Sequence, residues 1–313
     1  MPAALSVVLV NKLGFDRLRR VIACLEAQSL AGQLELVIVS PFEPPSQAPS
    51  SFACVKYVAC DSMDSLGPPR ALGVRACSAP YVVFAEDHCF PQPQWAESIL
   101  GRLREGWTGV GPAILNHNPG TWTSRADWLL NYGGFGPDRQ SGSCAYIAPH
   151  NSAYATAALQ RLDGELGELL QMDRNLQSRL LSEGGRLFFE PSARTAHTNL
   201  SRPRCHWSTQ FHGARVYGAL RARYEHWTAI RCGAYTLVFP AIAALRLVRA
   251  CTHLKGPREL PLFPLLILAS TIAAIGESCG YLFGAGSSLG WRAEEELDRV
   301  SGLIEAERRL LLP

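Results

Sequence analysis

The stretch Tyr81–His88, with the sequence YVVFAEDH, decides the fold that we expect of this chain. Its first five residues are apolar and two of them are β-branched, which is typical of a strand buried on both faces. The run ends abruptly in two carboxylates and an imidazole. In an open parallel sheet, ligands bind outside the carboxyl ends of the strands, so we expect a functional site at this point.

Glu86 and His88 are two residues apart, so in an extended chain their side chains point to the same side. An acid and an imidazole on one side can share a divalent metal ion. The alternative is a polar strand end followed by a turn, because Pro91 and Pro93 come next. Both interpretations stay open on this stretch alone.

Alternation of apolar runs and helical patterns indicates the rest of the fold. Helices are expected at residues 15–25, 70–77 and 95–104, between or after the apolar runs. Strands joined by crossovers of this length pair in parallel, which predicts an α/β fold. We expect strands at residues 5–10, 34–39, 55–58, 81–85 and 187–189.

Two segments in the middle of the chain do not follow this alternation. Residues 116–143 have no clear period and are expected to form a long irregular loop, which is usually functional or mobile. Residues 163–182 are expected to form one helix, with Asp173 on its buried leucine stripe. A carboxylate in such a place costs several kcal/mol unless it is paired or used. Asp173 is therefore either a functional group or half of an ion pair, with Arg179 or with an arginine elsewhere.

The composition excludes several classes of protein. The 313 residues have a net charge of only +3, which does not argue for a nucleic-acid partner. The ten cysteines form no CxxC pair, so a zinc knuckle is not expected. The N-terminal apolar run is short and lacks a basic lead, unlike a signal peptide, so we expect a reducing, cytosolic compartment for the main domain.

The character of the chain changes after about Trp207. Residues 232–245 are uncharged between Arg231 and Arg246, but a helix of that length spans only roughly 21 Å of a ~30 Å hydrocarbon core. Residues 260–276 are also uncharged. The pair predicts a re-entrant or interfacial hairpin, two marginal membrane spans, or a buried helical pair of a soluble protein. Residues 293–312 should form a charged amphipathic helix, and we expect two domains, 1–206 and 207–313.

Several motifs, taken in order, resemble family 2 glycosyltransferases of the GT-A fold over roughly residues 4–200. That family has two opening strands, an arginine at a helix start, a metal motif, an acceptor segment, a base-bearing helix and a closing Pro…His element. The corresponding segments here are residues 6–10 and 34–39, Arg70-Ala71-Leu72-Gly73, Glu86-Asp87-His88, His150-Asn151-Ser152-Ala153-Tyr154, Met172-Asp173, and Pro191 with His197.

The resemblance implies a mostly parallel, Rossmann-like sheet with helices on both faces, and a C-terminal apolar helical region. It implies transfer of a sugar from a nucleoside-diphosphate sugar to an acceptor hydroxyl with inversion, assisted by Mn²⁺ or Mg²⁺. Asp173 would be the catalytic base. Metal ligands would be Glu86, His88 and His197. Donor-binding residues would be Arg70, Asn151 and Asp87, and Asp87 would either support the metal ligands or contact the donor ribose.

Those implications extend to the biological setting. The acceptor would be a glycan or a lipid-linked molecule, in envelope or exopolysaccharide glycan synthesis. With the apolar C-terminal segments, this predicts an enzyme at the membrane surface, on the cytoplasmic face of the cell membrane.

Three positions depart from the family pattern. The second strand runs into Ser40-Pro41 where an aspartate usually reads the base, the metal motif is Glu-x-His, and Met172 replaces a glutamate. These departures favour an alternative: a GT-A-like module that no longer catalyses and binds a nucleotide or a partner at the membrane. Asp173 and Arg70 favour the enzyme.

Overall fold

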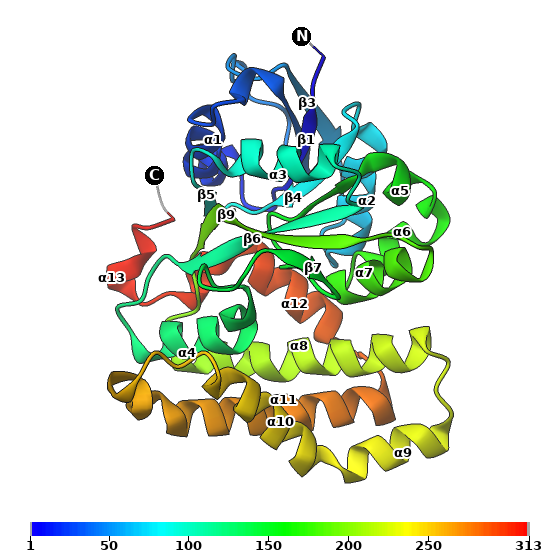
Figure 1. Ribbon diagram of the computed structural model, residues 1–313, viewed down its shortest axis with the longest axis vertical. Coiled ribbons are helices and arrows are strands. Elements are labelled where there is room, and N and C mark those ends of the chain that lie inside the picture. Colours follow the sequence, from blue (N-terminus) through cyan, green and yellow to red (C-terminus); the bar gives the residue numbers. More distant parts are fainter. Residues whose placement is uncertain (1, 312–313) are drawn as a thin grey trace. The chain divides into compact units, whose positions relative to one another are not determined.

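A computed structural model describes residues 2–311 of the chain (Figure 1). They form two compact units. The first runs to Leu115, includes Phe135–Thr198 and resumes at Arg309; the second comprises Asn116–Gly134 and Asn199–Arg308. This division differs from the expected domains 1–206 and 207–313, because a segment from the middle of the chain belongs with the C-terminal helices.

The first unit is built on one nine-stranded sheet with the order β3-β2-β1-β4-β8-β6-β9-β5, and β7 pairs with β9 beside this path. The strands are β1 (Leu5–Val10), β2 (Leu34–Ser40), β3 (Cys54–Ala59), β4 (Tyr81–Ala85), β5 (Cys89–Pro91), β6 (Gly109–Asn116), β7 (Gly142–Cys144), β8 (Ala153–Ala155) and β9 (Leu187–His197). The four expected N-terminal strands are all present.

The strand order reverses at β1, which lies between β2 and β4 and is parallel to both. Right-handed crossovers then place α1 (Arg19–Glu26) and α2 (Gly67–Ala76) on opposite faces of the sheet, as Figure 1 shows. Gly73 lets α2 approach closely, because a Cβ there would overlap the side chain of Val8 in β1. The reversal opens a crevice at the carboxyl ends of β1 and β4, where a ligand site is expected.

The other half of the sheet is antiparallel. β8 pairs antiparallel with both β4 and β6, and β5 and β7 pair antiparallel with β9. Helix α3 (Trp95–Arg104) packs against β9 and has the bounds expected from the sequence. The α/β fold with helices on both faces is confirmed; the sheet is parallel in β3-β2-β1-β4 and mixed beyond.

Two expectations about the middle of the chain were wrong. The helix expected at 163–182 is broken at residues 170–172 into α6 (Asp163–Leu169) and α7 (Asp173–Ser182), and α5 (Thr156–Gln160) precedes them. Asp173 therefore opens a helix instead of lying in the middle of a stripe. Residues 116–143, expected to be irregular, contain α4 (Trp122–Asn131), whose first turn is capped by Thr121 accepting a hydrogen bond from the Ser124 amide at 3.1 Å.

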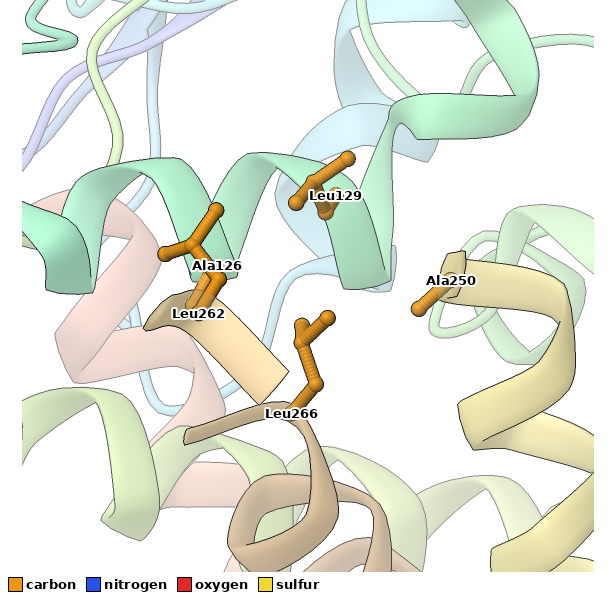
Figure 2. Close-up of a cluster of buried hydrophobic side chains, with 5 residues drawn as sticks. All are labelled: Ala126, Leu129, Ala250, Leu262 and Leu266. Carbon is orange, nitrogen blue, oxygen red and sulfur yellow. The ribbon is translucent and has the colours of Figure 1, made fainter. Parts of the chain in front are cut away.

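The second unit is helical. Its helices besides α4 are α8 (Pro203–Tyr224), α9 (Ala229–Leu237), α10 (Phe239–Cys251), α11 (Phe263–Phe283), α12 (Ser288–Leu297) and α13 (Glu305–Arg308). The tail expected as one amphipathic helix is interrupted between α12 and α13 by a 3-10 turn at Arg299–Gly302. A buried cluster joins α4 to the ends of α10 and α11 through Ala126, Leu129, Ala250, Leu262 and Leu266 (Figure 2).

Candidate functional site

Glu86 lies directly after β4, at the carboxyl edge of the parallel strands. It does not continue the strand, because residues 86–88 turn toward β5. The extended-chain argument that paired Glu86 with His88 therefore does not apply. The turn nevertheless brings the two side chains together: His88 Nε2 lies 3.2 Å from Glu86 Oε2, and both side chains are buried.

Two further histidines reach Glu86 through antiparallel pairing. β8 pairs with β4 so that Val83 lies opposite Ala153, and the segment directly before β8 brings His150 to Glu86. His150 Nδ1 forms a close ion pair with Glu86 Oε1. β9 ends at His197 opposite Cys89, which places His197 Nε2 3.9 Å from Glu86 Oε2. The rings of His150 and His197 stack with centroids 5.2 Å apart.

This surrounding sets the charge of Glu86. Burial alone would raise the pKa of the Glu86 carboxyl, but the positive charges and hydrogen bonds of His150 and His88 outweigh burial and hold its pKa well below its usual range. A guanidinium adds to this, because Arg70 Nη2 lies 3.4 Å from Glu86 Oε1. Glu86 is thus an ionised carboxylate in the protein interior, held among cationic and imidazole groups.

Arg70 connects Glu86 to Asp173. The guanidinium lies in the first half of α2, with Nη1 at 3.6 Å from Asp173 Oδ2 and Nη2 facing Glu86. Asp173 is buried at the first position of α7, and its Oδ1 has no hydrogen-bond partner among the described residues. The expected alternative partner Arg179 instead pairs with Glu165 and Glu183. Asp173 therefore belongs to the same cluster as Glu86.

Asp87 contacts His88 and Arg17. Its Oδ1 lies 2.8 Å from His88 Nδ1, and its Oδ2 lies 3.8 Å from the buried Arg17. A carboxylate on one nitrogen of an imidazole fixes the ring so that the other nitrogen can face a ligand. Here the other nitrogen faces Glu86, so the contact of Asp87 in this structure is one that orients His88.

Asn151 has an unusual backbone conformation and an unsatisfied side chain. It has φ of 52°, a conformation that L residues other than Asn and Asp rarely adopt. Its backbone is fixed, since its amide donates to Phe84 O at 2.9 Å and its carbonyl accepts from the Trp95 indole at 3.3 Å. Neither polar atom of its buried side chain has a hydrogen-bond partner among the described residues. Strain and an unsatisfied buried amide together are typical of a ligand position.

The chemistry of the cluster fits a divalent metal ion. Glu86, His150 and His197 offer one ligand atom each, and these atoms lie within 4.8 Å of one another. Glu86 Oε2 is buried and makes no well-aligned hydrogen bond, although His88 Nε2 lies 3.2 Å away. Two imidazoles with one carboxylate suit Mn²⁺, Fe²⁺ or Zn²⁺ better than an all-oxygen set does. These three metal ligands include two of the three that were expected, Glu86 and His197, and add His150. His88, the third expected ligand, is adjacent.

The structure brings the predicted residues Arg70, Glu86, His88, Asp173 and His197 into one cluster at the carboxyl edge of the parallel strands. Asn151 and Asp87 flank it. Sequence reasoning missed His150 and Arg17. The signal for His150 was its place directly before Asn151, but its contact depends on the antiparallel register of β8, which no local pattern reveals.

Comparisons with known proteins concern the family and the fold of the chain. A family model described as "Glycosyl transferase family 2" matches residues 6–163. No curated protein is significantly similar to the chain in sequence. Among solved structures, S. aureus TarS 1-349 in complex with UDP superposes with a TM-score of 0.50 at 12% identity, covering 89% of this chain and 90% of that one. At such identity the likeness concerns the fold alone.

Two other solved structures are less similar. S. aureus TarS 1-349 gives a TM-score of 0.49 at 11% identity, with 89% of this chain and 90% of that chain covered. GalNAc-T7 with UDP, GalNAc and Mn²⁺ gives 0.46 at 15% identity, with 63% of this chain covered. The match covers 44% of the length of GalNAc-T7, so this chain spans less than half of that protein.

Proposed function

Because the chain belongs to glycosyl transferase family 2, we propose that it is an enzyme that moves a sugar from a nucleoside-diphosphate sugar to an acceptor hydroxyl with inversion. The observation that carries the proposal is the buried cluster of Glu86, Arg70 and Asp173 at the carboxyl edge of the parallel strands. This cluster lies where an open α/β sheet binds its ligands. It combines a fixed cation with two carboxylates in different surroundings.

Each member has a distinct task. Arg70 supplies a permanent positive charge that would offset the charge developing on the leaving diphosphate. Asp173 has one oxygen near Arg70 and one without a hydrogen-bond partner among the described residues. That second oxygen can accept the proton of the acceptor hydroxyl, as a general base does. Asn151 would donate to or accept from the bound donor with its unsatisfied side-chain amide.

Glu86, His150 and His197, together with His88, would hold a divalent cation, Mn²⁺ or Mg²⁺ in the activity that we propose. Such an ion supplies positive charge next to the leaving group. Asp87 orients the His88 ring through the 2.8 Å contact and would leave direct donor contacts to Arg70 and Asn151. The imidazole-rich donor set favours Mn²⁺ over Mg²⁺.

We place the enzyme at the cytoplasmic face of the cell membrane, acting on a glycan or lipid-linked acceptor in envelope or exopolysaccharide synthesis. The support is the apolar character of the second unit. Within the described residues, Pro257–Phe283 is long and apolar enough to cross a membrane, and α9 with α10 would pass as one segment that bends by 63°. A lipid-linked acceptor would be presented at such a surface.

The test is a screen of nucleoside-diphosphate sugars with Mn²⁺, Mg²⁺ or chelator, scored by release of nucleoside diphosphate. We expect release with one donor class, stimulated more by Mn²⁺ than by Mg²⁺, and a product of inverted anomeric configuration. Arg70→Ala serves as the inactive control. Binding of nucleoside diphosphate without turnover of any donor would instead favour the binding module that the departures from the family motifs suggest.

A further inference from the structure

Helix α11 has two faces of opposite character. One face is buried and rich in small residues, including Ala273, Gly276 and Gly280. A Cβ at Gly276 or Gly280 would overlap the backbone oxygen of Phe211 or Arg215, so α11 lies in direct backbone contact with α8. The other face exposes large apolar side chains, among them Ile267, Leu268 and Ile275.

Helices α9 and α10, which pack against α11, also expose large apolar side chains. Ile230 and Leu237 are 86% and 82% exposed, and Val248 and Phe283 are 59% and 72% exposed. Together with Ile267 and Ile275 of α11 they form what we call the apolar surface of the second unit. Side chains of this size are seldom left so exposed in a group unless something covers them.

The charges near the apolar surface are almost all positive. Between residues 229 and 283 the chain has five basic residues and two acidic ones. Both acids are engaged: Glu277 is buried and pairs with Arg246 at 2.5 Å, and Glu259 accepts from the Lys255 amide at 2.6 Å. Arg231, Arg249, Lys255 and Arg258 are exposed. An apolar surface bordered by exposed cations is complementary to an anionic lipid surface.

The packing of α8 opposes a membrane-crossing arrangement. α8 follows α11 closely and carries Arg215, Arg221 and Arg223 (Figure 1). If α11 crossed the hydrocarbon core, the polar side chains of α8 beside its middle, such as Gln210 and His212, would enter the core as well, which is costly. Arg215 and Arg221 would lie at the C-terminal edge of the crossing segment. A surface position avoids this cost, because α8 then remains on the aqueous side of α11.

Both ends of α11 are also attached to α8, the C-terminal end directly and the N-terminal end through α4. At its C-terminal end, Gly284 O accepts from Arg215 Nε at 3.0 Å. At its N-terminal end, Leu262 and Leu266 pack on Ala126 and Leu129 of α4 (Figure 2). α4 is in turn joined to α8 by the buried pair of Asp127 and His206 at 2.8 Å. While this unit is folded, α11 therefore cannot cross a bilayer unless α8 crosses beside it.

We propose that α9, α10 and α11 lie in the plane of one leaflet of an anionic membrane, with the apolar surface immersed and no segment crossing. This deepens the membrane association proposed above and does not require sugar transfer. A second copy of the chain is a poorer occupant, because a symmetric contact would bring exposed Arg249 and Arg258 of both copies together and like charges oppose that contact, although Arg231 pairs with Glu225 at 3.6 Å.

Sedimentation of the full-length protein with vesicles tests whether an anionic membrane covers the apolar surface. We expect binding to vesicles that contain phosphatidylglycerol, weaker binding to pure phosphatidylcholine, and weakening by salt. Ile230→Glu with Leu237→Glu should lower the partition coefficient roughly 100-fold, because two immersed aliphatic side chains are replaced by charges. Phe42→Glu, an exposed apolar residue of the first unit, should bind as wild type does. A protein that leaves both vesicle types unbound, or a double variant that forms monomers from a wild-type dimer, would overturn the proposal.

Sidedness separates an in-plane arrangement from two spans. The chain has three lysines, Lys12, Lys56 and Lys255, and Lys255 lies in the connection between α10 and α11. Membrane vesicles of known orientation from an expression host are treated with an impermeant amine reagent and mapped by mass spectrometry. In-plane binding predicts that Lys255 is modified from the same side as Lys12. Modification of Lys255 from the opposite side would refute it while leaving membrane association intact, and donor turnover in the same preparation tests the proposed function separately.

Discussion

Two buried glutamates, Glu35 and Glu86, lie at opposite edges of the parallel part of the sheet, and their surroundings differ completely. Glu35 belongs to β2, near the amino edge of the sheet, whereas Glu86 follows β4 at the carboxyl edge. Both are shielded from solvent. Burial of a carboxylate is therefore not in itself a sign of function. The groups that the carboxylate contacts distinguish a structural role from a functional one.

Glu35 is fully satisfied by its neighbours. It accepts hydrogen bonds from the Ser6 hydroxyl, from the Ser78 amide at 2.8 Å and from the Ser78 hydroxyl at 2.5 Å, and Lys56 Nζ lies 2.7 Å away. Burial would raise the pKa of Glu35, but Lys56, Ser6 and Ser78 together lower it to about 2. All its donors come from the sheet and the segment that follows α2, so Glu35 ties these elements together.

Glu86 is surrounded by cationic and imidazole groups, and its Oε2 faces His88 Nε2 at 3.2 Å without a well-aligned hydrogen bond. Unsatisfied polar atoms in the interior are costly and persist where a ligand completes them. The contrast between the two glutamates indicates a structural role for Glu35 and a functional one for Glu86. The following predictions test that distinction.

The largest expected effect is on turnover in Asp173→Asn. If Asp173 is the general base, the rate of transfer should fall by roughly 10²- to 10⁴-fold. Donor affinity should barely change, because Asp173 acts on the acceptor hydroxyl. Melting temperature should hold or rise, since a buried charge is removed.

The competing interpretation of Asp173 is a structural ion pair with Arg70, whose Nη1 lies 3.6 Å away. In that case the same variant should lose stability, by up to ~3–5 kcal/mol. A destabilised variant with normal transfer rate per folded molecule would remove Asp173 from the mechanism.

Glu35→Gln should show the opposite combination of effects from Asp173→Asn, with lower stability and unchanged turnover. We expect a loss of about 2–3 kcal/mol in the free energy of unfolding, because the Lys56 pair is lost and three donors are left facing a neutral amide. Transfer rate per folded molecule should stay at the wild-type value. Urea unfolding together with activity measures both, and a tenfold loss of specific activity would contradict the structural role of Glu35.

The contribution of Glu35 to stability should depend on pH in a defined window. Its pKa in the folded protein, about 2, lies below its ordinary value near 4.5, so the folded state favours the ionised form. This stabilisation is present above about pH 4.5 and disappears as the pH falls toward 2. The stability difference between wild type and Glu35→Gln should shrink across that window. A difference that stays constant from pH 6 to pH 3 would contradict it.

A smaller effect is expected for Asp87→Asn. If Asp87 orients His88, this variant should weaken divalent-cation affinity by about 10-fold, the usual lower range for such a partner. His88→Ala should abolish the metal dependence of nucleotide binding. In the His88→Ala background, Asp87→Asn should have no further effect on cation affinity. An additive loss in the double variant would show that Asp87 acts on the donor directly.

The sequence predicted much of this arrangement because local patterns encode it. The strands β1 to β4 and the helices α1 to α3 follow from apolar runs and their ends, whereas β5 was not predicted. Glu86 was located by the abrupt end of one run. Three features depend on long-range pairing: the antiparallel register of β8 that brings His150 to Glu86, the break between α6 and α7 that turns Asp173 toward Arg70, and the packing of α4 with the C-terminal helices. None of them leaves a local signature.

Calorimetric titration of a nucleoside diphosphate, with Mn²⁺ or with chelator, into wild type and Glu86→Gln tests the central claim most directly. His206→Gln is the matched control, because His206 is a buried histidine paired with a carboxylate outside this cluster. We predict that Mn²⁺ strengthens nucleotide binding to wild type and to His206→Gln by at least about 10-fold, as one or more added charge contacts would, and that Glu86→Gln loses this dependence while remaining folded. If Mn²⁺ strengthened nucleotide binding to Glu86→Gln as much as to wild type, the assignment of Glu86 as a ligand of the metal ion would be contradicted.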